Sequence, residues 1–414
     1  FTYPSHTTKG CVPLSSDVTF IGDNAFLNCT LLVSLGDLSS VTAIEYFAFA
    51  GCSSLERLEH LDNLVSLGES VFGYGSHYTG CISLKSIGDM PKLESMGQKC
   101  FVSCTTLETV GDLSSLKEIP YEAFDGCTSL VSIGDLNNVE SIANEAFSNC
   151  SALEHVDKLD KITSIGQNAF KGCTALKSIG SLHNLETIGQ GAFSGCSALE
   201  HVDDLYSLTR LEYDVFSHCV SLISVDCSDK LTAIGSSAFF GCKALVSIGD
   251  LSNVTSIESS VFRGCIALKS IGNMPKLESI GMQCFMGCTA LETVGDLSSL
   301  KEIPSETFDG CTSLVSIGDL SNVTIIGSYG FNQCKKLTSI PNLGSLERVD
   351  QFAFSGCESL ALLGNLRKLT SFGNSPFVNS PFHNCPNLVL EVLPDSAAEQ
   401  YAKNYSMQYT YITE

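Results

Sequence analysis

The ten-residue stretch CTSLVSIGDL stands at residues 127–136 and recurs letter for letter at residues 311–320. The two copies lie 184 residues apart, which is eight intervals of 23. The Cys that opens the stretch belongs to a series in which thirteen of fifteen intervals are 23 residues, and a Phe stands three positions before each Cys. The series is Cys29, Cys52, Cys81, Cys104, Cys127, Cys150, Cys173, Cys196, Cys219, Cys242, Cys265, Cys288, Cys311, Cys334, Cys357 and Cys385. A fixed period of this length is typical of stacked-repeat architectures, so it overrules the two or three globular domains that the length would suggest.

Apolar residues recur mostly at every third position within a rung, the name we give to each 23-residue unit. This spacing is neither that of a long helix nor the alternation of a half-buried strand. In the rung that begins at Cys127 the apolar residues are Leu130, Ile133, Leu136, Val139, Ile142, Ala146 and Phe147. We expect these side chains to point inward and to form one continuous core when rungs stack about 4.8 Å apart.

Each rung is predicted to hold two extended segments and a tight helical turn. Leu130–Ile133 has the β-branched and Ser/Thr content of a strand, and Gly134-Asp135 ends it. The segment SIANEAFSNC at residues 141–150 would contain a second extended piece and a helical turn that carries Phe147. An acidic or amide residue at the position of Asp135, usually after a Gly, suits an Asx turn, which bonds the backbone just ahead. The positions are Asp37, Asp89, Asp112, Asp135, Asp204, Asp250, Asp296 and Asp319, with Asn273, Asn342 and Asn365.

These expectations describe an α/β solenoid of about sixteen stacked rungs, with a parallel β-sheet on one face and short helical turns on the other. At the usual strand spacing the stack would be roughly 75 Å long. The word LxxIxxAFxxC in 23-residue steps resembles the BspA-like, or treponemal-type, leucine-rich repeat family over about residues 18–414. The resemblance implies a leucine-rich-repeat superhelix. It also implies an extracellular or cell-surface bacterial protein, since some members are linked to adhesion to host matrix proteins or other cells.

One departure from the family pattern is clear. Family rungs often read I-x-I-P after the leading Leu, whereas this chain mostly reads I-G-D-L, and SIPNL at residues 339–343 keeps a Pro nearby. We therefore expect the strand face to be shorter or kinked.

The expected domain organisation is a single solenoid with modified ends. Residues 1–28 form a partial N-terminal rung or cap, residues 29–385 the repeats, and residues 386–414 a C-terminal cap. Solenoid ends expose core and need such caps. In the last segment Ser396 and Glu399 form a capping box that opens a helix, and MQYTYI reads as a closing strand. The partial first rung suggests that another segment preceded residue 1.

Two insertions interrupt the period. GYGSHYTG at residues 73–80 reads as a surface loop, and Tyr74 and Tyr78 are candidate binding residues there because loops on rigid scaffolds often carry function. A tolerated surface insertion is the alternative. The second insertion, at residues 375–379, belongs to a tandem slip, SPFVNSPFHN, near the C-terminal cap.

Composition restricts the partners. The net charge is −22, from 45 acidic and 23 basic residues, which argues against nucleic acid and against anionic membrane surfaces. Such a charge favours a soluble monomer. No apolar run approaches the ~20 residues of a membrane helix, so no membrane insertion is expected.

The cysteines are predicted to be structural. The twenty Cys make up about 5% of the chain, below the ~8–10% of disulfide scaffolds. Sixteen occupy one inward repeat position, where free Cys packs as a small hydrophobe and stacked neighbours suit disulfides poorly. Cys11 and Cys227 lie off this ladder. No C-x-x-C occurs, so neither a metal site nor a cofactor is predicted.

Four rungs break an otherwise smooth strand face and supply the candidate binding residues. The two outward positions are usually Ser or Thr and then Gly, but these rungs carry Arg57 with Glu59, His155 with Asp157, His201 with Asp203, and Ser224 with Asp226. The two His would lie about 10 Å apart, too far to ligate one metal ion. We predict that a specific ligand would bind the concave face around residues 155–226.

Three functions fit the pattern. The first is a non-enzymatic binding module that recognises a protein or glycan on a host or neighbouring cell surface. The second is a structural spacer that presents another domain, which the smooth Ser/Gly face favours. The third, and the most remote, is a carbohydrate-active enzyme on a β-solenoid, for which Asp157 and Asp203 are the only candidate carboxylate pair. No hydrolase, metalloprotease or phosphate-loop motif occurs, so no catalytic residue is predicted.

Overall fold

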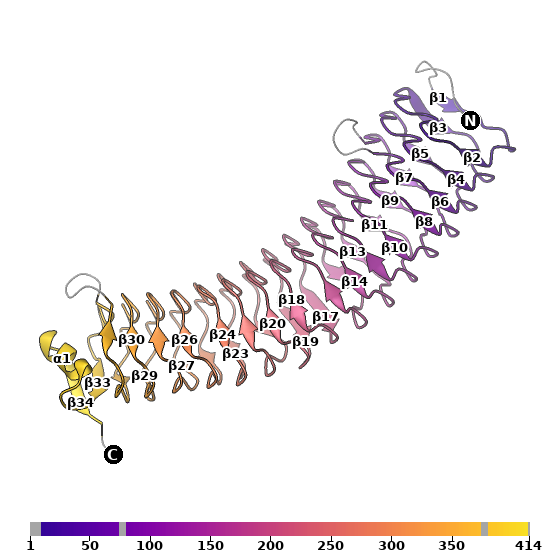
Figure 1. Cartoon of the computed structure of the whole chain (residues 1–414). Helices are drawn as coiled ribbons and strands as arrows, with labels where there is room; N and C mark the ends of the chain where they lie inside the picture. Colours follow the sequence, from indigo (N-terminus) through magenta and orange to yellow (C-terminus); the bar gives the residue numbers. More distant parts are fainter. Residues whose placement is uncertain (1–9, 74–79, 374–379, 413–414) are drawn as a thin grey trace. The chain divides into compact units, whose positions relative to one another are not determined.

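The computed structural model describes residues 10–73, 80–373 and 380–412. They fall into two compact units, residues 1–207 and 208–414, each of which is described by itself. Within both units the rungs are stacked, and each rung contributes two short strands (Figure 1). We call the strand before the Gly-Asp position the A-strand and the strand nine residues later the B-strand. In the rung that begins at Cys127 these are β11 (Ser132–Ile133) and β12 (Ser141–Ile142).

The first unit contains parallel ladders in which most residues pair with the equivalent residue 23 positions away, as Ser132 does with Thr109. Across the first insertion the separation is 29, as for Arg57 and Ser86. Its A-strands pair in the orders β1-β3, β5-β7-β9-β11 and β13-β15, and its B-strands in the orders β2-β4-β6-β8 and β10-β12-β14-β16. The remaining A-strands are β1 (Gly10–Val12), β3 (Leu32–Leu35), β5 (Arg57–Leu58), β7 (Ser86–Ile87), β9 (Thr109–Val110), β13 (His155–Val156), β15 (Ser178–Ile179) and β17 (His201–Leu205). The remaining B-strands are β2 (Phe20–Ile21), β4 (Ala43–Ile44), β6 (Ser66–Leu67), β8 (Ser95–Met96), β10 (Glu118–Ile119), β14 (Ser164–Ile165) and β16 (Thr187–Ile188).

The second unit repeats this plan. Its A-strands are β19 (Ser224–Cys227), β21 (Ser247–Ile248), β23 (Ser270–Ile271), β25 (Thr293–Val294), β27 (Ser316–Ile317), β29 (Ser339–Ile340), β31 (Leu362–Leu363) and β33 (Val389–Val392). Its B-strands are β18 (Arg210–Leu211), β20 (Ala233–Ile234), β22 (Ser256–Ile257), β24 (Ser279–Ile280), β26 (Glu302–Ile303), β28 (Ile325–Ile326), β30 (Arg348–Val349) and β32 (Ser371–Phe372). The unit ends in α1 (Ala397–Asn404) and β34 (Gln408–Tyr411), which pairs in parallel with β33.

The predicted solenoid is confirmed, with shorter strands than expected. The A-strand of the Cys127 rung begins at Ser132 rather than at Leu130, and most strands contain only two residues. The predicted core residues of this rung are buried except Ile133, which is half-buried.

The side opposite the strands is built from reverse turns rather than from helix. Around Phe147, backbone bonds run from Ser148 N to Glu145 O (3.1 Å) and from Cys150 N to Phe147 O (3.2 Å). Glu145 and Asn149 have left-handed φ values of 57° and 59°, which interrupt any right-handed helical run. Equivalent left-handed residues recur along the chain, and α1 is the one α-helix of the described residues. This side therefore consists of turns that are locked by bonds to the next rung.

The predicted Asx turns form where the next residues allow them. Asp135 Oδ1 accepts a hydrogen bond from Asn137 N at 2.9 Å, and the same bond forms on the rungs of Asp37, Asp112, Asp250, Asp296 and Asp319. Asp89 is followed two residues later by Pro91, which has no N–H to donate. Its carboxylate accepts instead from Asp112 N of the next rung, at 3.0 Å.

The core contains a stack of aromatic rings. Phe147 lies between Phe124 and Phe170, with centroid separations of 5.2 Å and interplanar angles of 5° on both sides. Such aromatic contacts stabilise by about 0.5–1.5 kcal/mol beyond simple area burial. Each rung thus places the same ring in register with its neighbours.

The cysteine ladder lies beside the rings, and its thiols form hydrogen bonds between rungs in addition to filling the core. All twenty Cys are free, and those of the ladder from Cys52 to Cys357 are buried. Each of these thiols donates a hydrogen bond to the carbonyl of the Phe in the preceding rung where the bond is described, as Cys173 Sγ does to Phe147 O at 3.1 Å. Burial raises the pKa of Cys52 to about 12, which keeps its thiol protonated as a donor. Of the four Cys that lie off the ladder, Cys100, Cys227 and Cys284 are buried and Cys11 is exposed.

Candidate functional site

The candidate site predicted from sequence lies on the A-strand surface of the first unit. His155 opens β13 and His201 opens β17, and both side chains are exposed. Asp157 and Asp203 are also exposed. The rung between them contributes Ser178, which pairs with His155 across the ladder. We call the surface formed by β13, β15, β17 and their following turns the His–Asp patch.

The backbone explains why acidic residues can occupy these rungs. On most regular rungs the second outward position favours Gly because a Cβ there would overlap the preceding rung, as a Cβ on Gly134 would overlap the carbonyl oxygen of Gly111. After Asp157 and Asp203 the chain turns through left-handed residues, Lys158 with φ 58° and Asp204 with φ 66°. A Cβ on Gly180, in the rung after Asp157, would lie 3.2 Å from Lys158 N. The altered turn therefore leaves more space between neighbouring rungs for a side chain than the rung of Gly134 has.

His155 is held over the neighbouring rung. Its Nδ1 lies 2.8 Å from Ser178 Oγ, and its Nε2 lies 3.9 Å from Glu154 Oε2. Lys177 Nζ binds the same Glu154 oxygen at 2.8 Å, and this hydrogen bond lowers the pKa of Glu154. The imidazole is thus positioned by its neighbours while half of its side-chain surface stays open to solvent (49%).

The middle rung contributes a polar network that sequence reasoning missed. Ser181 Oγ donates to Asp204 Oδ2 at 2.8 Å and lies 3.0 Å from His183 Nδ1. His183 Nε2 lies 2.9 Å from Asn184 Nδ2, an arrangement that fits a neutral imidazole accepting from the amide. The available signal was the local density of His, since three of the eight His of the chain lie between residues 155 and 201.

The patch has the chemistry of hydrogen bonding and charge recognition. It offers exposed carboxylates, imidazoles and hydroxyls that can bind sugar hydroxyls or basic side chains. Within residues 10–73, 80–373 and 380–412, no group of three or more His, Cys, Asp or Glu side chains could hold a metal ion. Asp226, the remaining acidic residue of the prediction, lies exposed on β19 of the second unit.

Arg57 and Glu59 form a separate feature. Arg57 Nε lies 3.8 Å from Glu59 Oε1, and both residues line a hollow of about 220 Å³ together with Asp37 and His60. His60 is left-handed (φ 60°), as are the residues that follow Asp157 and Asp203. Hydrogen bonds from Ser39, and to a smaller degree the charge of His60, lower the pKa of Asp37. Sequence reasoning identified Arg57 and Glu59 as outward-facing residues but missed His60. Tyr74 and Tyr78 lie outside the described residues.

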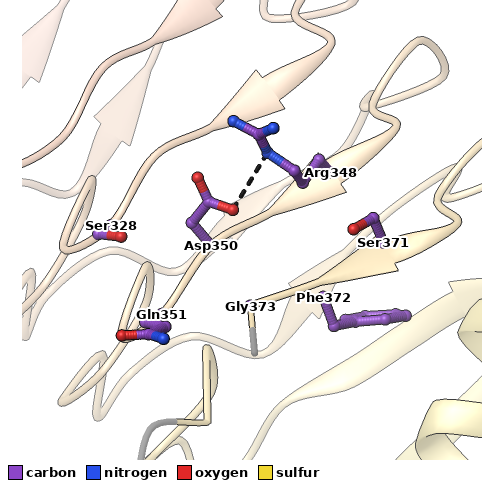
Figure 2. Close-up of a pocket in the computed structure, with 7 residues that line it drawn as sticks. All are labelled: Ser328, Arg348, Asp350, Gln351, Ser371, Phe372 and Gly373. Carbon is purple, nitrogen blue, oxygen red and sulfur yellow. Dashed lines mark ion pairs between the residues drawn. The ribbon is translucent and has the colours of Figure 1, made fainter. Parts of the chain in front are cut away.

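A larger hollow, of about 510 Å³, lies on the B-strand side of the second unit (Figure 2). Arg348 Nε and Asp350 Oδ1 form an ion pair of 3.1 Å at its edge, and Phe372 and Gln351 complete much of the lining. Sequence reasoning missed it because only the A-strand positions were searched. The signal was the spacing Arg-x-acid, which places both side chains on one face of a strand.

The repeat pattern matches a family model described as BspA type leucine rich repeat region (6 copies), at residues 7–110, 75–177, 163–292 and 278–388. The chain belongs to the BspA-type leucine-rich repeat family. Among curated proteins, no sequence matches this chain.

Solved structures of bacterial leucine-rich repeat proteins resemble this BspA-type protein. A leucine-rich repeat protein from Bacteroides ovatus is 28% identical, with a TM-score of 0.70, over 84% of this chain and 88% of the other. A leucine rich cell surface protein from Faecalibacterium prausnitzii is also 28% identical, with a TM-score of 0.47, over 74% of this chain and 87% of the other.

Membership restricts the class of function. Leucine-rich repeat proteins are generally non-enzymatic scaffolds for protein–protein interaction, and BspA-type proteins are typically found on bacterial surfaces. In the part of this BspA-type protein that the structure describes, no helix is both long and apolar enough to cross a membrane. The BspA-type chain is thus a protein-interaction module by family.

Proposed function

We propose that this protein is a bacterial cell-surface or secreted, adhesin-like module that binds a protein or glycan of a host or neighbouring cell through the His–Asp patch. Family membership supports the interaction role, and the typical surface location of BspA-type proteins supports the location. The ligand contacts are the side chains of His155, Asp157, His201 and Asp203.

The observation on which this proposal rests is that exposed His and Asp replace the usual Ser/Gly pair on two rungs. These two rungs lie on either side of β15. On most regular rungs a Cβ at this position would overlap the preceding rung, and on both His–Asp rungs the acidic residue is followed by a left-handed residue. Exposed polar residues on a rigid scaffold are favoured positions for binding. The patch thus combines altered backbone, exposed carboxylates and the pre-positioned imidazole of His155 at one place.

The chemistry of the patch favours a polar ligand. Carboxylates and imidazoles form directional hydrogen bonds to hydroxyl groups, and the net charge of −22 attracts basic partners over long range. Binding should therefore weaken as salt increases, because exposed charges are screened within about 8 Å at physiological ionic strength.

The proposal is tested by binding the purified chain to a panel of immobilised matrix proteins and glycans at low and physiological salt. A quadruple variant, His155→Ala, Asp157→Ala, His201→Ala and Asp203→Ala, is measured beside it. We expect saturable binding to at least one panel member and its loss in the quadruple variant.

A matched control removes similar groups elsewhere on the surface. Asp62, Asp229 and His383 are exposed and lie outside the patch. Their triple Ala variant should bind as the unchanged chain does. If the folded chain binds no panel member, the adhesin-like proposal fails and the structural spacer is favoured instead.

A further inference from the structure

On the turn side of the second unit, the residue that follows the ladder Cys changes character over three consecutive rungs. On many rungs this residue is Ser or Thr, and its hydroxyl donates to the carbonyl one rung earlier, as Thr312 Oγ1 does to Thr289 O at 3.3 Å. Val220, Lys243 and Ile266 replace these hydroxyls. The regular polar column is therefore interrupted by bulky apolar and cationic side chains.

A second column changes alongside the first. The residue that follows the core Phe is often Ser, as at Ser148, Ser194 and Ser355. In the second unit three successive rungs place Phe240, Arg263 and Met286 there, and all three side chains are partly exposed.

A hollow of about 420 Å³ lies between these two columns. Gly241, Gly264 and Gly287 contribute to its lining and leave the space between the columns open. His218 continues the glycine column at one end, where its ring packs edge-on against Phe240 with centroids 5.0 Å apart.

The walls of the hollow are fixed by further contacts. The Arg263 guanidinium lies 5.7 Å from the centroid of the Phe240 ring, a cation–π distance. Arg263 Nη1 also donates to Gln283 Oε1 at 2.8 Å. The arginine is thus anchored at the rim of an apolar wall.

The charge of the hollow is opposite to that of the chain. Lys243 and Arg263 line it, and no carboxylate does, although the chain carries −22 overall. The acidic residues of the next rungs are hydrogen-bonded to amides, and Glu306 is linked to Arg263 through Gln283. Glu306 accepts from Gln283 Nε2 at 2.8 Å, and Asp309 accepts from Asn332 Nδ2 at 2.8 Å.

We propose that this hollow binds an extended acidic peptide segment of a partner protein, with an apolar side chain against Phe240 and Met286 and carboxylates on Lys243 and Arg263. Three rung spacings span about 14 Å, which fits roughly four extended residues. The apolar wall requires an apolar group, and the overall negative charge disfavours longer polyanions, so an acidic peptide with an aromatic or aliphatic residue suits both features. This surface is separate from the His–Asp patch, and its binding does not depend on the function proposed for that patch.

The test is selection of a displayed library of short random peptides on the whole chain, followed by fluorescence anisotropy with one selected peptide. We expect the selected peptides to be enriched in Asp and Glu next to Phe, Tyr or Leu. The variant Arg263→Gln with Lys243→Gln should bind the selected peptide at least about tenfold more weakly, and Phe240→Ser should weaken binding by a similar factor.

The matched control is Lys171→Gln, which removes a cation from the same column of the first unit, at a rung that follows the regular polar pattern. It should leave binding unchanged. The proposal is overturned if selection yields no acidic enrichment, or if the double variant binds the selected peptide as tightly as the unchanged chain does. It is also overturned, in favour of a second copy of the chain as occupant, if sedimentation shows self-association that Phe240→Ser abolishes.

Discussion

The thiol of Cys150 donates a hydrogen bond to the carbonyl oxygen of Phe124, one rung earlier, over 3.1 Å. The same oxygen accepts a second bond from the backbone N–H of Cys127, at 3.0 Å. Both lone pairs of this buried carbonyl are therefore used, one within the rung and one between rungs. The arrangement explains why the repeat retains Cys next to Phe: the side chain is small enough to be buried and long enough to reach the preceding rung.

Substitution of Cys150 tests this dual role. Cys150→Ala removes the sulfur and the inter-rung donor, and we expect a loss of roughly 1–2 kcal/mol in the free energy of unfolding. Cys150→Ser should cost at least as much, because the shorter C–O bond leaves the hydroxyl out of reach of Phe124 O in an apolar site. Urea denaturation followed by circular dichroism measures both, with the exposed Cys11→Ser as the control. A serine variant as stable as the unchanged chain would contradict the role assigned to the thiol.

Thiol reactivity provides an independent test of the ladder. Burial raises the pKa of Cys52 and Cys288 to about 12, so almost no thiolate is present at these two buried ladder positions at pH 8. At Cys385 a hydrogen bond with the Cys357 thiol lowers the pKa instead. In the folded protein an alkylating reagent should modify exposed Cys11 rapidly and half-buried Cys29 and Cys385 slowly. The other thiols should react only after denaturation. Mass spectrometry of the alkylated peptides makes the measurement, and rapid modification of any buried ladder Cys would refute the packing described above.

Alanine substitutions at three glycines of the second unit distinguish the cost of backbone strain from the cost of steric overlap. A Cβ on Gly272 would meet no atom within 4 Å, and its φ is not left-handed, so Gly272→Ala should be neutral or slightly stabilising. Gly310 has a φ of 74° but ordinary space around its Cβ position, so Gly310→Ala should cost about 1 kcal/mol from conformation alone. A Cβ on Gly318 would overlap Gly295 O, and Gly318→Ala should be the most destabilising. Thermal unfolding gives the order, and equal midpoints for the three variants would be inconsistent with close rung approach.

The C-terminal cap should loosen in acid. Glu399 pairs with Lys403 (2.8 Å) and accepts from Tyr411 Oη (2.7 Å) and from Asp395 N (2.9 Å), which together lower its pKa to about 2. Because this value lies below the ~4.3 of an unfolded Glu, the carboxylate stabilises the cap above the unfolded pKa. That stabilisation is lost as the pH falls from about 5 towards 2. The protection factors of the β34 amides, which correct for the intrinsic pH dependence of exchange, should therefore fall over this range.

Glu399→Gln is the control for that titration. The variant should exchange β34 amides faster at neutral pH and show a weaker dependence on acid, since no carboxylate titrates at this position. If the variant and the unchanged chain respond to acid identically, Glu399 does not couple to cap stability.

The fold could be predicted because the inward positions repeat almost without exception. Leu, Ile, Phe and Cys at fixed steps of 23 residues specify both the rung and its stacking. The turn geometry could not be predicted in the same way. Glu145 and Asn149 lie in a segment whose composition suits a helix, yet their N–H groups bond to Gln167 O and Lys171 O of the next rung, at 2.8 and 2.7 Å. These inter-rung bonds select left-handed conformations that a single rung in isolation does not favour.

Some residues of the candidate sites could likewise be identified from the sequence, and others could not. His155 and Asp157 could be identified from sequence because they depart from a Ser/Gly column whose direction was already known. His183 and Ser181 could not, because their proximity to the patch depends on the path of the turn after β15. The hollow at Phe240 was missed because the turn side was treated as uniform. The segments AFFGCK and FRGCI nevertheless differ clearly from the usual sequence of that side.

The most direct test of the His–Asp patch is the affinity of four forms of the chain for a panel protein or glycan that binds it. The forms are the unchanged chain, the double variant His155→Ala with Asp157→Ala, the double variant His201→Ala with Asp203→Ala, and the quadruple variant. We expect each double variant to bind at least about tenfold more weakly, and the quadruple variant to lose less than the sum of the two because one ligand contacts both rungs. Unchanged affinity in the quadruple variant, with its fold intact, would contradict the assignment of the His–Asp patch as the binding site.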